Sequence, residues 1–194
     1  MIGGLVLAAG AGTRYGSRSK LLAELEGRPL LEHAVAAQCA VPELERVAVV
    51  LGAFASEVLA RVHFMRSEPV VCERWEEGQA YSLRRGIEFL TDGRSDVRRV
   101  IVTLGDQPRM TPELIARFVS EPPGTRAAYG GRPGHPVVLG PVQMRAIASL
   151  RGDQGARDLL LGGGRIECGT LSAALDVDTP EDLEAIRHEA RAVV

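Results

Sequence analysis

The stretch LVLAAGAGTRYGSRSK, Leu5–Lys20, joins an apolar run to a turn of small residues and then to a group of cations. The apolar residues before the turn indicate a buried strand. Glycine and alanine let the backbone of the turn come close to a bulky ligand, because they carry little or no side chain. Arg14, Arg18 and Lys20 follow directly, and their charge indicates that this ligand is anionic.

The glycine spacing of this turn matches neither of two common phosphate-binding motifs. Gly10, Gly12 and Gly16 give G-x-G-x-x-x-G, which is one residue longer than the dinucleotide fingerprint. A P-loop has lysine directly after its last glycine, whereas Ser17 follows here. Taken alone, the turn is equally typical of an ordinary glycine-rich connection between a strand and a helix. The rest of the chain has to decide between these interpretations.

Strand-like and helix-like segments alternate along the chain, which predicts an α/β fold with a mostly parallel sheet and helices on both faces. The segment RVIVTLG at 99–105 is rich in β-branched residues, as expected of a strand buried on both faces. Residues 126–140 predict two strands around a Gly/Pro turn. Other strands are expected at 2–9, 46–52 and 69–73, and helices at 29–40, 55–63, 81–90, 111–120, 153–161 and 179–194.

Two of these helices have clear start signals. Thr111 stands as a cap before Pro112, and Thr179 with Asp182 has the spacing of a capping box, with Asp in place of the usual Glu or Gln. No repeat, low-complexity tract or long linker divides the sequence. We therefore expect one domain over 1–194.

The composition excludes several classes of protein. A net charge of −2 and an aromatic content of 4% do not suit a surface that binds nucleic acid through cations and stacking rings. Cys39, Cys72 and Cys168 are far apart and form no CxxC pair, so neither a zinc site nor a disulfide framework is predicted. No apolar run approaches the about 20 residues of a membrane helix. We expect a cytoplasmic protein without nucleic-acid or membrane partners.

Three aspartates are candidate metal ligands. Asp106 follows the expected strand at 99–105, and a carboxylate at the carboxyl end of a strand beside a phosphate loop suits Mg²⁺. Asp176 and Asp178 stand two apart, so both would face the same side of an extended segment. Ordinary roles stay open, since aspartate often ends strands and Asp178 also precedes the helix start at Thr179.

The combination of motifs resembles a known family. Leu7–Lys20 resembles the signature loop of the Rossmann-like nucleotidyltransferases, and six later stretches resemble the molybdenum cofactor cytidylyltransferase family. The likeness extends from residue 4 to about residue 185. The six stretches are KLLAELEGRPLLEHAV (20–35), EEGQAYSLRRGI (76–87), TLGDQP (103–108), GRPGHPVVL (131–139), GDQGARDLL (152–160) and DVDTPEDL (176–183).

Two details of the first loop refine this resemblance. The double alanine of LAAG is similar to the pyrimidine-using members, whereas relatives that transfer guanylyl groups tend to have glycine in place of the second alanine. The loop departs from the family in having three residues, rather than two, between Gly16 and Lys20, and in having Tyr15 where methionine or phenylalanine is commoner. The extra residue makes Arg18 an alternative to Lys20 as the phosphate-binding cation.

The resemblance implies a single Rossmann-like nucleotidyltransferase domain. Residues 1–120 would form its nucleotide-binding half, and 121–194 the acceptor-binding half with the closing helix. The implied reaction transfers CMP from CTP to molybdopterin cofactor and gives the cytosine dinucleotide form and pyrophosphate. Mg²⁺ is the implied cofactor, and a molybdenum hydroxylase is a candidate recipient of the product.

The implied nucleotide site is the first turn. The backbone amides of 11–13 would cradle the triphosphate, and Arg14 and Lys20 would neutralise it. Arg14, Lys20 and Asp106 are accordingly the expected catalytic residues. The expected nucleotide-binding residues are Leu7, Ala8, Ala9, Gly10, Ala11, Gly12, Thr13, Arg14 and Lys20. The expected metal ligands are Asp106, Asp178 and Asp176.

The second half is expected to bind the acceptor through Gly134, His135, Pro136 and Arg157. For His135 the sequence favours orientation of the acceptor over proton transfer, because neither an attacking phosphate nor a leaving pyrophosphate needs a proton. These residues come from the GHP and GDxGAR motifs, which are more specific to the family than the first loop.

Other functions share parts of this pattern. A nucleotidyltransferase for a sugar phosphate, a methylerythritol phosphate or a phospholactate-type acceptor would use the same loop and Asp106. A non-catalytic carrier or insertion chaperone for the cofactor would not need Asp106, Asp176 and Asp178. A nicotinamide-dependent dehydrogenase is disfavoured by the glycine spacing and by LGAFASEV, which has no carboxylate before Glu57.

Overall fold

Residues of the first strand alternate between two apolar layers, and this alternation organises the fold. The computed structural model describes residues 1–16, 18–93, 96–160, 162–169 and 175–192. In strand β1 (Ile2–Ala8), Leu5 and Leu7 pack into one layer and Val6 and Ala8 into the other. All four side chains are buried, so the sheet is covered on both faces at β1.

One seven-stranded sheet runs through both halves of the chain. Its order is β5-β4-β1-β6-β8-β7-β9, and neighbouring strands are parallel except for β8, which is antiparallel to β6 and to β7. The mostly parallel sheet predicted from the sequence is therefore confirmed. The strands besides β1 are β4 (Leu44–Leu51), β5 (Glu68–Val71), β6 (Arg99–Leu104), β7 (Arg126–Tyr129), β8 (Arg132–Leu139) and β9 (Arg165–Glu167).

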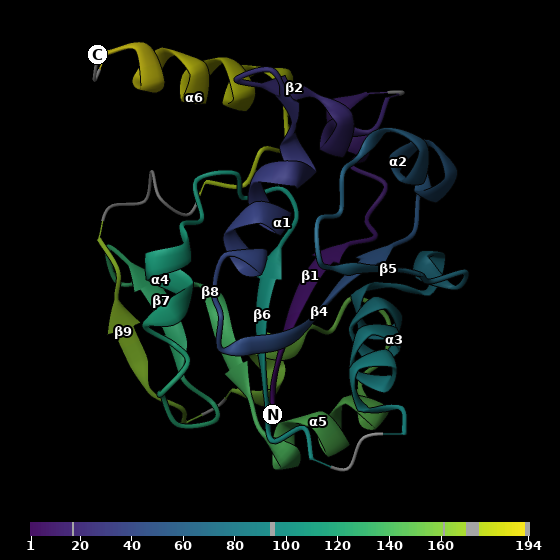
Figure 1. The fold of residues 1–194 in the computed structure, drawn as a ribbon, viewed down its shortest axis with the longest axis vertical. Coiled ribbons are helices and arrows are strands. Elements are labelled where there is room, and N and C mark those ends of the chain that lie inside the picture. The colour runs from purple at the N-terminus through teal and green to yellow at the C-terminus, as the bar shows by residue number, and fades with distance from the viewer. Residues whose placement is uncertain (17, 94–95, 161, 170–174, 193–194) are drawn as a thin grey trace.

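Helices lie on both faces of this sheet (Figure 1). Helices α1 (Leu30–Cys39), α2 (Ala55–Arg61) and α4 (Pro112–Ala116) pack on one face, while α3 (Gln79–Thr91) and α5 (Pro141–Ala146) pack on the other. The predicted α/β architecture is thus confirmed. Among the described residues, no helix combines the length and the apolar character needed to cross a membrane.

The last helix, α6 (Pro180–Ala192), lies at one end of the molecule (Figure 1). It packs against a small antiparallel hairpin of β2 (Glu24–Leu25) and β3 (Arg28–Pro29) through a separate apolar cluster. The members of this cluster are Leu25, Leu30, Val177, Leu183 and Ile186. This contact holds the segment that precedes α6 close to the first turn of the chain.

Two buried details fix how closely the helices approach β1. A Cβ on Gly86 would lie 2.4 Å from Leu5 Cδ1, so only glycine lets α3 sit this low on the sheet. On the other face, Gln38 of α1 is fully buried, and its amide donates to Thr103 Oγ1 (3.0 Å) and the Ile101 carbonyl (3.2 Å). Both contacts hold the helices against the strands that carry the site.

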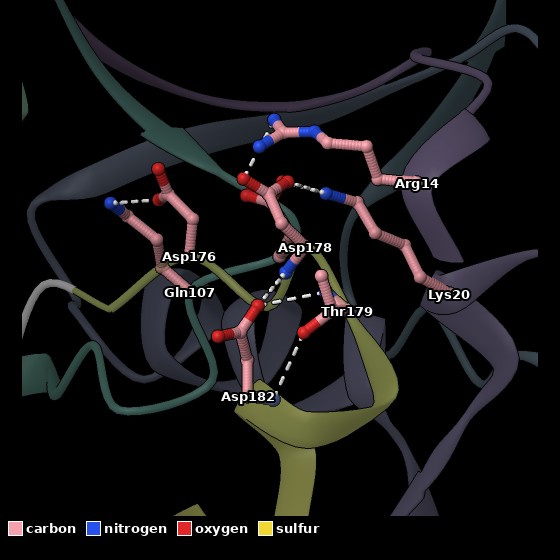
Figure 2. A network of polar contacts seen from close by, with 8 residues as sticks. Arg14, Lys20, Gln107, Asp176, Asp178, Thr179 and Asp182 are labelled. Atoms are coloured by element: carbon pink, nitrogen blue, oxygen red, sulfur yellow. Dashed lines mark hydrogen bonds and ion pairs between the residues drawn. The ribbon is translucent and has the colours of Figure 1, made fainter. Parts of the chain in front are cut away.

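The predicted helix caps are confirmed. Thr111 Oγ1 accepts a hydrogen bond from the Leu114 amide (3.2 Å) at the start of α4. At α6, Thr179 Oγ1 accepts from the Asp182 amide (3.2 Å), while Asp182 Oδ2 accepts from the Thr179 amide (2.7 Å; Figure 2). This reciprocal pair is a capping box in which aspartate takes the place of glutamate.

Several element boundaries differ from the predicted ones. Helix α4 is shorter than the predicted 111–120, and the predicted helix at 153–161 is a 3₁₀ turn, Ala156–Leu159. Leu161 and the last two residues, 193–194, lie outside the described residues. The sequence pattern predicts neither the hairpin nor β9, because these strands have two or three residues each and are largely exposed.

Candidate active site

The candidate site lies where the strand order of the sheet reverses. Strand β1 lies between β4 and β6, and the turns after β1 and β6 leave the same edge because these strands are parallel. The Gly105 amide donates to the Leu7 carbonyl (2.9 Å), which continues the pairing up to Asp106. Ligands of open α/β sheets bind at such a reversal. The glycine turn and Asp106 therefore meet where a ligand is expected.

Lys20 runs directly against the glycine turn. Gly12 has a φ of 58°, and a Cβ on it would lie 3.2 Å from Lys20 Cγ and 3.3 Å from Cδ. Glycine at this position thus provides both the left-handed backbone and the room for the stem of Lys20. Only 9% of Lys20 is exposed, whereas Arg18 is exposed. The structure therefore brings Lys20, and not Arg18, to the carboxyl end of β6.

Four charged side chains, Arg14, Lys20, Asp106 and Asp178, form an ionic cluster at this point. Figure 2 shows Arg14 and Lys20 directed toward Asp178. The Lys20 ammonium donates to Asp106 Oδ2 (2.7 Å) and to Asp178 Oδ1 (2.9 Å). Arg14 Nη2 lies 2.8 Å from Asp178 Oδ2. The cluster joins the first turn, the end of β6 and the start of α6, so the three predicted catalytic residues lie together.

The two cations of the ionic cluster are held differently. Burial opposes the charge of Lys20, but the pairing with Asp106 and Asp178 outweighs it and raises the pKa of the amine above its usual value. In contrast, 72% of the Arg14 side chain is exposed. An exposed ion pair contributes little to stability, so Arg14 can leave Asp178 for an anionic ligand at small cost.

Asp106 and Asp178 are the carboxylates best placed to hold a divalent metal. Asp106 Oδ1 is buried and has no hydrogen-bond partner among the described residues, while Oδ2 faces the same ammonium as Asp178. Mg²⁺ commonly uses one or two protein carboxylates, with phosphate and water oxygens as the other ligands. In the part of the chain that the structure describes, no three acidic, histidine or cysteine side chains form a metal-binding group. The residues present fit a metal that is shared with a bound phosphate.

Asp176 contacts a different partner from Asp178. Its Oδ1 accepts a hydrogen bond from Gln107 Nε2 (2.8 Å; Figure 2), and burial, followed by the charge of Asp106, raises the pKa of Asp176 to about 6. Residues 175–178 do not form the extended strand that the prediction assumed, and Asp176 and Asp178 contact different partners. The Val177 amide bonds to the Asp106 carbonyl (2.9 Å), and the chain then turns into the α6 cap.

Three adjoining cavities form a cleft along this edge of the sheet. The glycine-loop pocket (about 230 Å³) ends at the ionic cluster, the tryptophan pocket (about 360 Å³) lies beside Trp75, and the histidine pocket (about 470 Å³) lies beside His135. The first two pockets share Leu7, Gly10 and Asp106. The second and third share Leu7, Gln79, Leu104 and Asp153. The cleft thus connects the ionic cluster to the second half of the chain.

The predicted site residues lie along this cleft with one exception. The predicted nucleotide-binding residues Leu7–Arg14 and Lys20 all line the glycine-loop pocket or the tryptophan pocket. Of the predicted acceptor residues, Gly134, His135 and Arg157 line the histidine pocket. Pro136 is buried and is not part of its lining.

The cleft also contains residues that the sequence did not identify. Trp75 and Gln79 line the tryptophan pocket, and the loop around Asp153 contacts them from the second half of the chain. Gly78 has a φ of 102°, and a Cβ on it would lie 2.2 Å from the Gly152 carbonyl carbon. The two glycines are the signal in the sequence, since Gly78 marks the close approach of the two backbones and Gly152, with a φ of 55°, has the left-handed backbone that favours glycine.

His135 is held by its backbone at the edge of the histidine pocket. The Tyr129 hydroxyl donates to the His135 carbonyl (2.6 Å), and a Cβ on Gly134 would lie 2.9 Å from the Tyr129 ring. Burial lowers the pKa of the partly buried imidazole to about 4, so the ring is neutral at pH 7. A neutral, fixed ring suits the expected orienting role.

The fold and the ionic cluster at the end of the cleft define a nucleotidyltransferase. The model of the MobA-like NTP transferase domain matches residues 4–166, and this chain belongs to that family. The family assignment agrees with the resemblance seen in the sequence motifs.

Individual relatives of known sequence or structure extend this likeness over the whole chain. Nicotine blue oxidoreductase of Paenarthrobacter nicotinovorans is 35% identical to this chain, and the match covers 93% of each of the two chains. The Rv0371c homologue of Mycobacterium sp. strain JC1 has the same fold, with a TM-score of 0.82 and 27% identity over 100% of this chain and 98% of that one. Rv0371c of Mycobacterium tuberculosis in complex with manganese has a TM-score of 0.76 and 26% identity over 96% and 98% of the two chains.

Proposed function

We propose that this protein transfers CMP from CTP to molybdopterin cofactor, giving the cytosine dinucleotide form and pyrophosphate. The observation that carries the proposal is the ionic cluster, with Lys20 2.7 Å from Asp106 and 2.9 Å from Asp178, at one end of a cleft that continues into a second pocket. Such a cleft suits a reaction between a triphosphate at one end and a bulky acceptor at the other.

The triphosphate binds in the glycine-loop pocket. The backbone amides of 11–13 cradle its oxygens, as small-residue turns commonly do for phosphates. Arg14 and Lys20 move from Asp106 and Asp178 to the β- and γ-phosphates, because each cation can exchange a carboxylate partner for a phosphate. Ala8 and Ala9 leave room for the ribose and base, and the tryptophan pocket receives the cytosine.

Asp106 and Asp178 hold a divalent metal, proposed to be Mg²⁺, once Lys20 has moved to the phosphates. When bound, the metal supplies Lewis-acid stabilisation of the α-phosphate and a template for the two substrates. The orphaned Oδ1 of Asp106 supports this role, and the manganese complex of the related Rv0371c is consistent with it. Asp176 accepts a hydrogen bond from Gln107, and both residues line the histidine pocket.

The chemical step needs no general base. A phosphate oxygen of the acceptor attacks the α-phosphorus in line, a new P–O bond forms, and the bond to the β-phosphate breaks as its electron pair leaves with pyrophosphate. The attacking oxygen is already anionic, so catalysis consists of positioning and charge neutralisation. His135 and Gly134 orient the acceptor in the histidine pocket.

A second candidate is a redox activity, which the likeness to nicotine blue oxidoreductase over 93% of both chains favours. The glycine turn lacks the dinucleotide fingerprint, which weighs against it. Within nucleotidyl transfer, the runner-up is another phosphorylated acceptor, such as a sugar phosphate or methylerythritol phosphate. A non-catalytic carrier of the cofactor is disfavoured, because such a protein would not need the ionic cluster.

The deciding experiment mixes the purified protein with Mg²⁺, molybdopterin cofactor and one of CTP, GTP, ATP or UTP, and measures pyrophosphate release. Release with CTP, and much less with the others, is the expected result. CTP binding without release calls for the acceptor panel of sugar phosphate and methylerythritol phosphate. If none of the four nucleoside triphosphates binds, and the protein transfers hydride from a reduced nicotinamide dinucleotide to an added quinone-type electron acceptor, the redox activity would replace the proposal.

A further inference from the structure

Arg126 opens β7 and lines the histidine pocket, although the sequence motifs do not include it. Ala127 and Tyr129 of the same strand pack toward α4, so Arg126 alternates to the opposite face of the sheet. Its side chain is partly buried and makes neither an ion pair nor a side-chain hydrogen bond with any described residue.

Each of the other partly buried arginines of the described chain makes at least one side-chain hydrogen bond, although Nε of Arg84 has no partner. Arg46 binds Glu68 and the Phe89 carbonyl, and the rest donate to backbone carbonyls or carboxylates. These arginines are Arg46, Arg84, Arg99, Arg109 and Arg187. Arg126 is the partly buried arginine of the described residues that makes no side-chain hydrogen bond or ion pair, and none of its nitrogens is shut off from solvent. Its guanidinium is therefore available to a ligand in the pocket.

The strand register separates Arg126 from the ionic cluster. Arg126 pairs with Val137 of β8, and Val137 pairs with Val102 of β6. Arg126 thus lies two strands to the side of β6, about 10 Å at the usual strand spacing of ~4.8 Å. It also lies level with Val102, short of the strand end that leads to Asp106. This separation places an anion bound by Arg126 apart from the phosphate that reacts at Asp106.

A second unpaired cation accompanies it. Arg132 begins β8, lines the same pocket, and has no ion pair or side-chain hydrogen bond with a described residue. The carboxylates in this pocket are Asp153 and Asp176, and the latter already accepts from Gln107. The far end of the histidine pocket thus presents forked donors that match an anion.

We infer that Arg126, assisted by Arg132, binds a second anionic group of the acceptor, separate from the phosphate that attacks. The inference rests on the proposed function, in that the histidine pocket holds the acceptor. It defines the substrate class more closely: the acceptor carries two anionic groups, one at each end, and a simple monophosphate fills only one of the two positions.

The test uses protein labelled with ¹⁵N in arginine, whose Nε–H signals are followed by NMR. The Arg126 signal is assigned by its loss in Arg126→Lys. Three probes are added separately: inorganic phosphate, CTP with Mg²⁺, and molybdopterin cofactor under anaerobic conditions. We expect the cofactor and inorganic phosphate to shift the Arg126 signal, and CTP alone to leave it in place.

Affinity measurements complete the test. Arg126→Gln should weaken binding of molybdopterin cofactor by about tenfold or more, as expected for loss of a charge-assisted contact, with CTP affinity unchanged. Arg126→Lys should recover part of the loss. Arg165→Gln is the matched control, because Arg165 pairs with Arg126 in the sheet, is exposed, and is not part of the pocket lining.

The outcomes separate this inference from the proposed function. A shift caused by inorganic phosphate but not by the cofactor supports the anion site and rejects molybdopterin as the acceptor. A shift caused by CTP alone places Arg126 in the nucleotide site and overturns the inference. If neither inorganic phosphate nor the cofactor shifts the Arg126 signal, the inference is also overturned, whatever the result of the pyrophosphate assay.

Discussion

The two ends of the cleft treat their charges in opposite ways. At the glycine-loop pocket, Lys20 is paired with Asp106 and Asp178, and Arg14 with Asp178. At the histidine pocket, Arg126 makes no ion pair with any residue that the structure describes. The first end is assembled in advance and must exchange internal partners for a ligand. At the second end, Arg126 can bind a ligand without first leaving a carboxylate partner. Nucleotide and acceptor should therefore bind with different dependence on metal and on salt.

The largest effect is expected from Asp106→Asn. The change removes a charge from the ionic cluster and a ligand of the proposed metal, so turnover should fall by at least about 10²–10³-fold. The thermal midpoint should change little, because the side chain remains isosteric. Asp92→Asn, at the exposed end of α3, is the control. Undiminished pyrophosphate release with Mg²⁺ would refute the role given to Asp106.

Gly78→Ala should disrupt the close backbone contact between Gly78 and Gly152, which joins the two halves of the chain beside the cleft. Its φ of 102° and the 2.2 Å approach to Gly152 predict a loss of at least about 3 kcal/mol in the free energy of unfolding. Gly93→Ala is the matched control. Gly93 also has a positive φ, 62°, but a Cβ on it would have no atom within 4 Å, so the change should cost only about 1–2 kcal/mol of the free energy of unfolding. Urea unfolding measures both. Equal losses would mean that the contact with Gly152 contributes nothing.

Lys20→Met tests whether the ammonium holds the place of the metal. Binding of Mn²⁺ without nucleotide, followed by the electron spin resonance of free Mn²⁺, should become about tenfold tighter, because Asp106 loses its cation and Asp178 loses one of its two. The KM for CTP should rise at the same time. Arg18→Met, at an exposed neighbouring position, should change neither quantity. Weaker Mn²⁺ binding in Lys20→Met would contradict the exchange of partners at this end.

The smallest effect concerns His135. Its pKa is lowered to about 4 in the folded protein from 6.5, so below pH 6.5 the unfolded chain takes up a proton that the folded chain does not. Stability is therefore full above pH 6.5 and falls as the pH drops toward 4. Between pH 7 and pH 5.5, the native protein should lose about 1 kcal/mol more than His135→Gln. His63→Gln, at an exposed histidine, should follow the native protein.

The sequence predicted those parts of the fold that depend on local patterns. The alternating apolar residues of β1, the cap at Thr111 and the capping box of Thr179 and Asp182 are all decided within a few residues, and all are confirmed. Strand β9 has only three residues and little apolar pattern, so its pairing depends on β7 being in place first. Nothing local marks it.

The candidate site was predictable to the same extent. Arg14, Lys20 and Asp106 could be identified because they follow strands whose carboxyl ends meet at one edge. The different partners of Asp176 and Asp178 could not be predicted, because the prediction assumed an extended strand and residues 175–178 do not form one. The isolation of Arg126 depends on what surrounds it in three dimensions, and no spacing in the sequence distinguishes it from the paired arginines.

The position of Trp75 has an optical consequence. The chain contains one tryptophan, and this residue lines the pocket between the ionic cluster and the histidine pocket. All indole emission of the protein therefore arises at the cleft. A pyrimidine that enters beside the indole should alter its emission, while unfolding elsewhere should leave it unchanged until the cleft opens. The arrival of each substrate can thus be followed on the unmodified protein, without a dye or a coupled reaction.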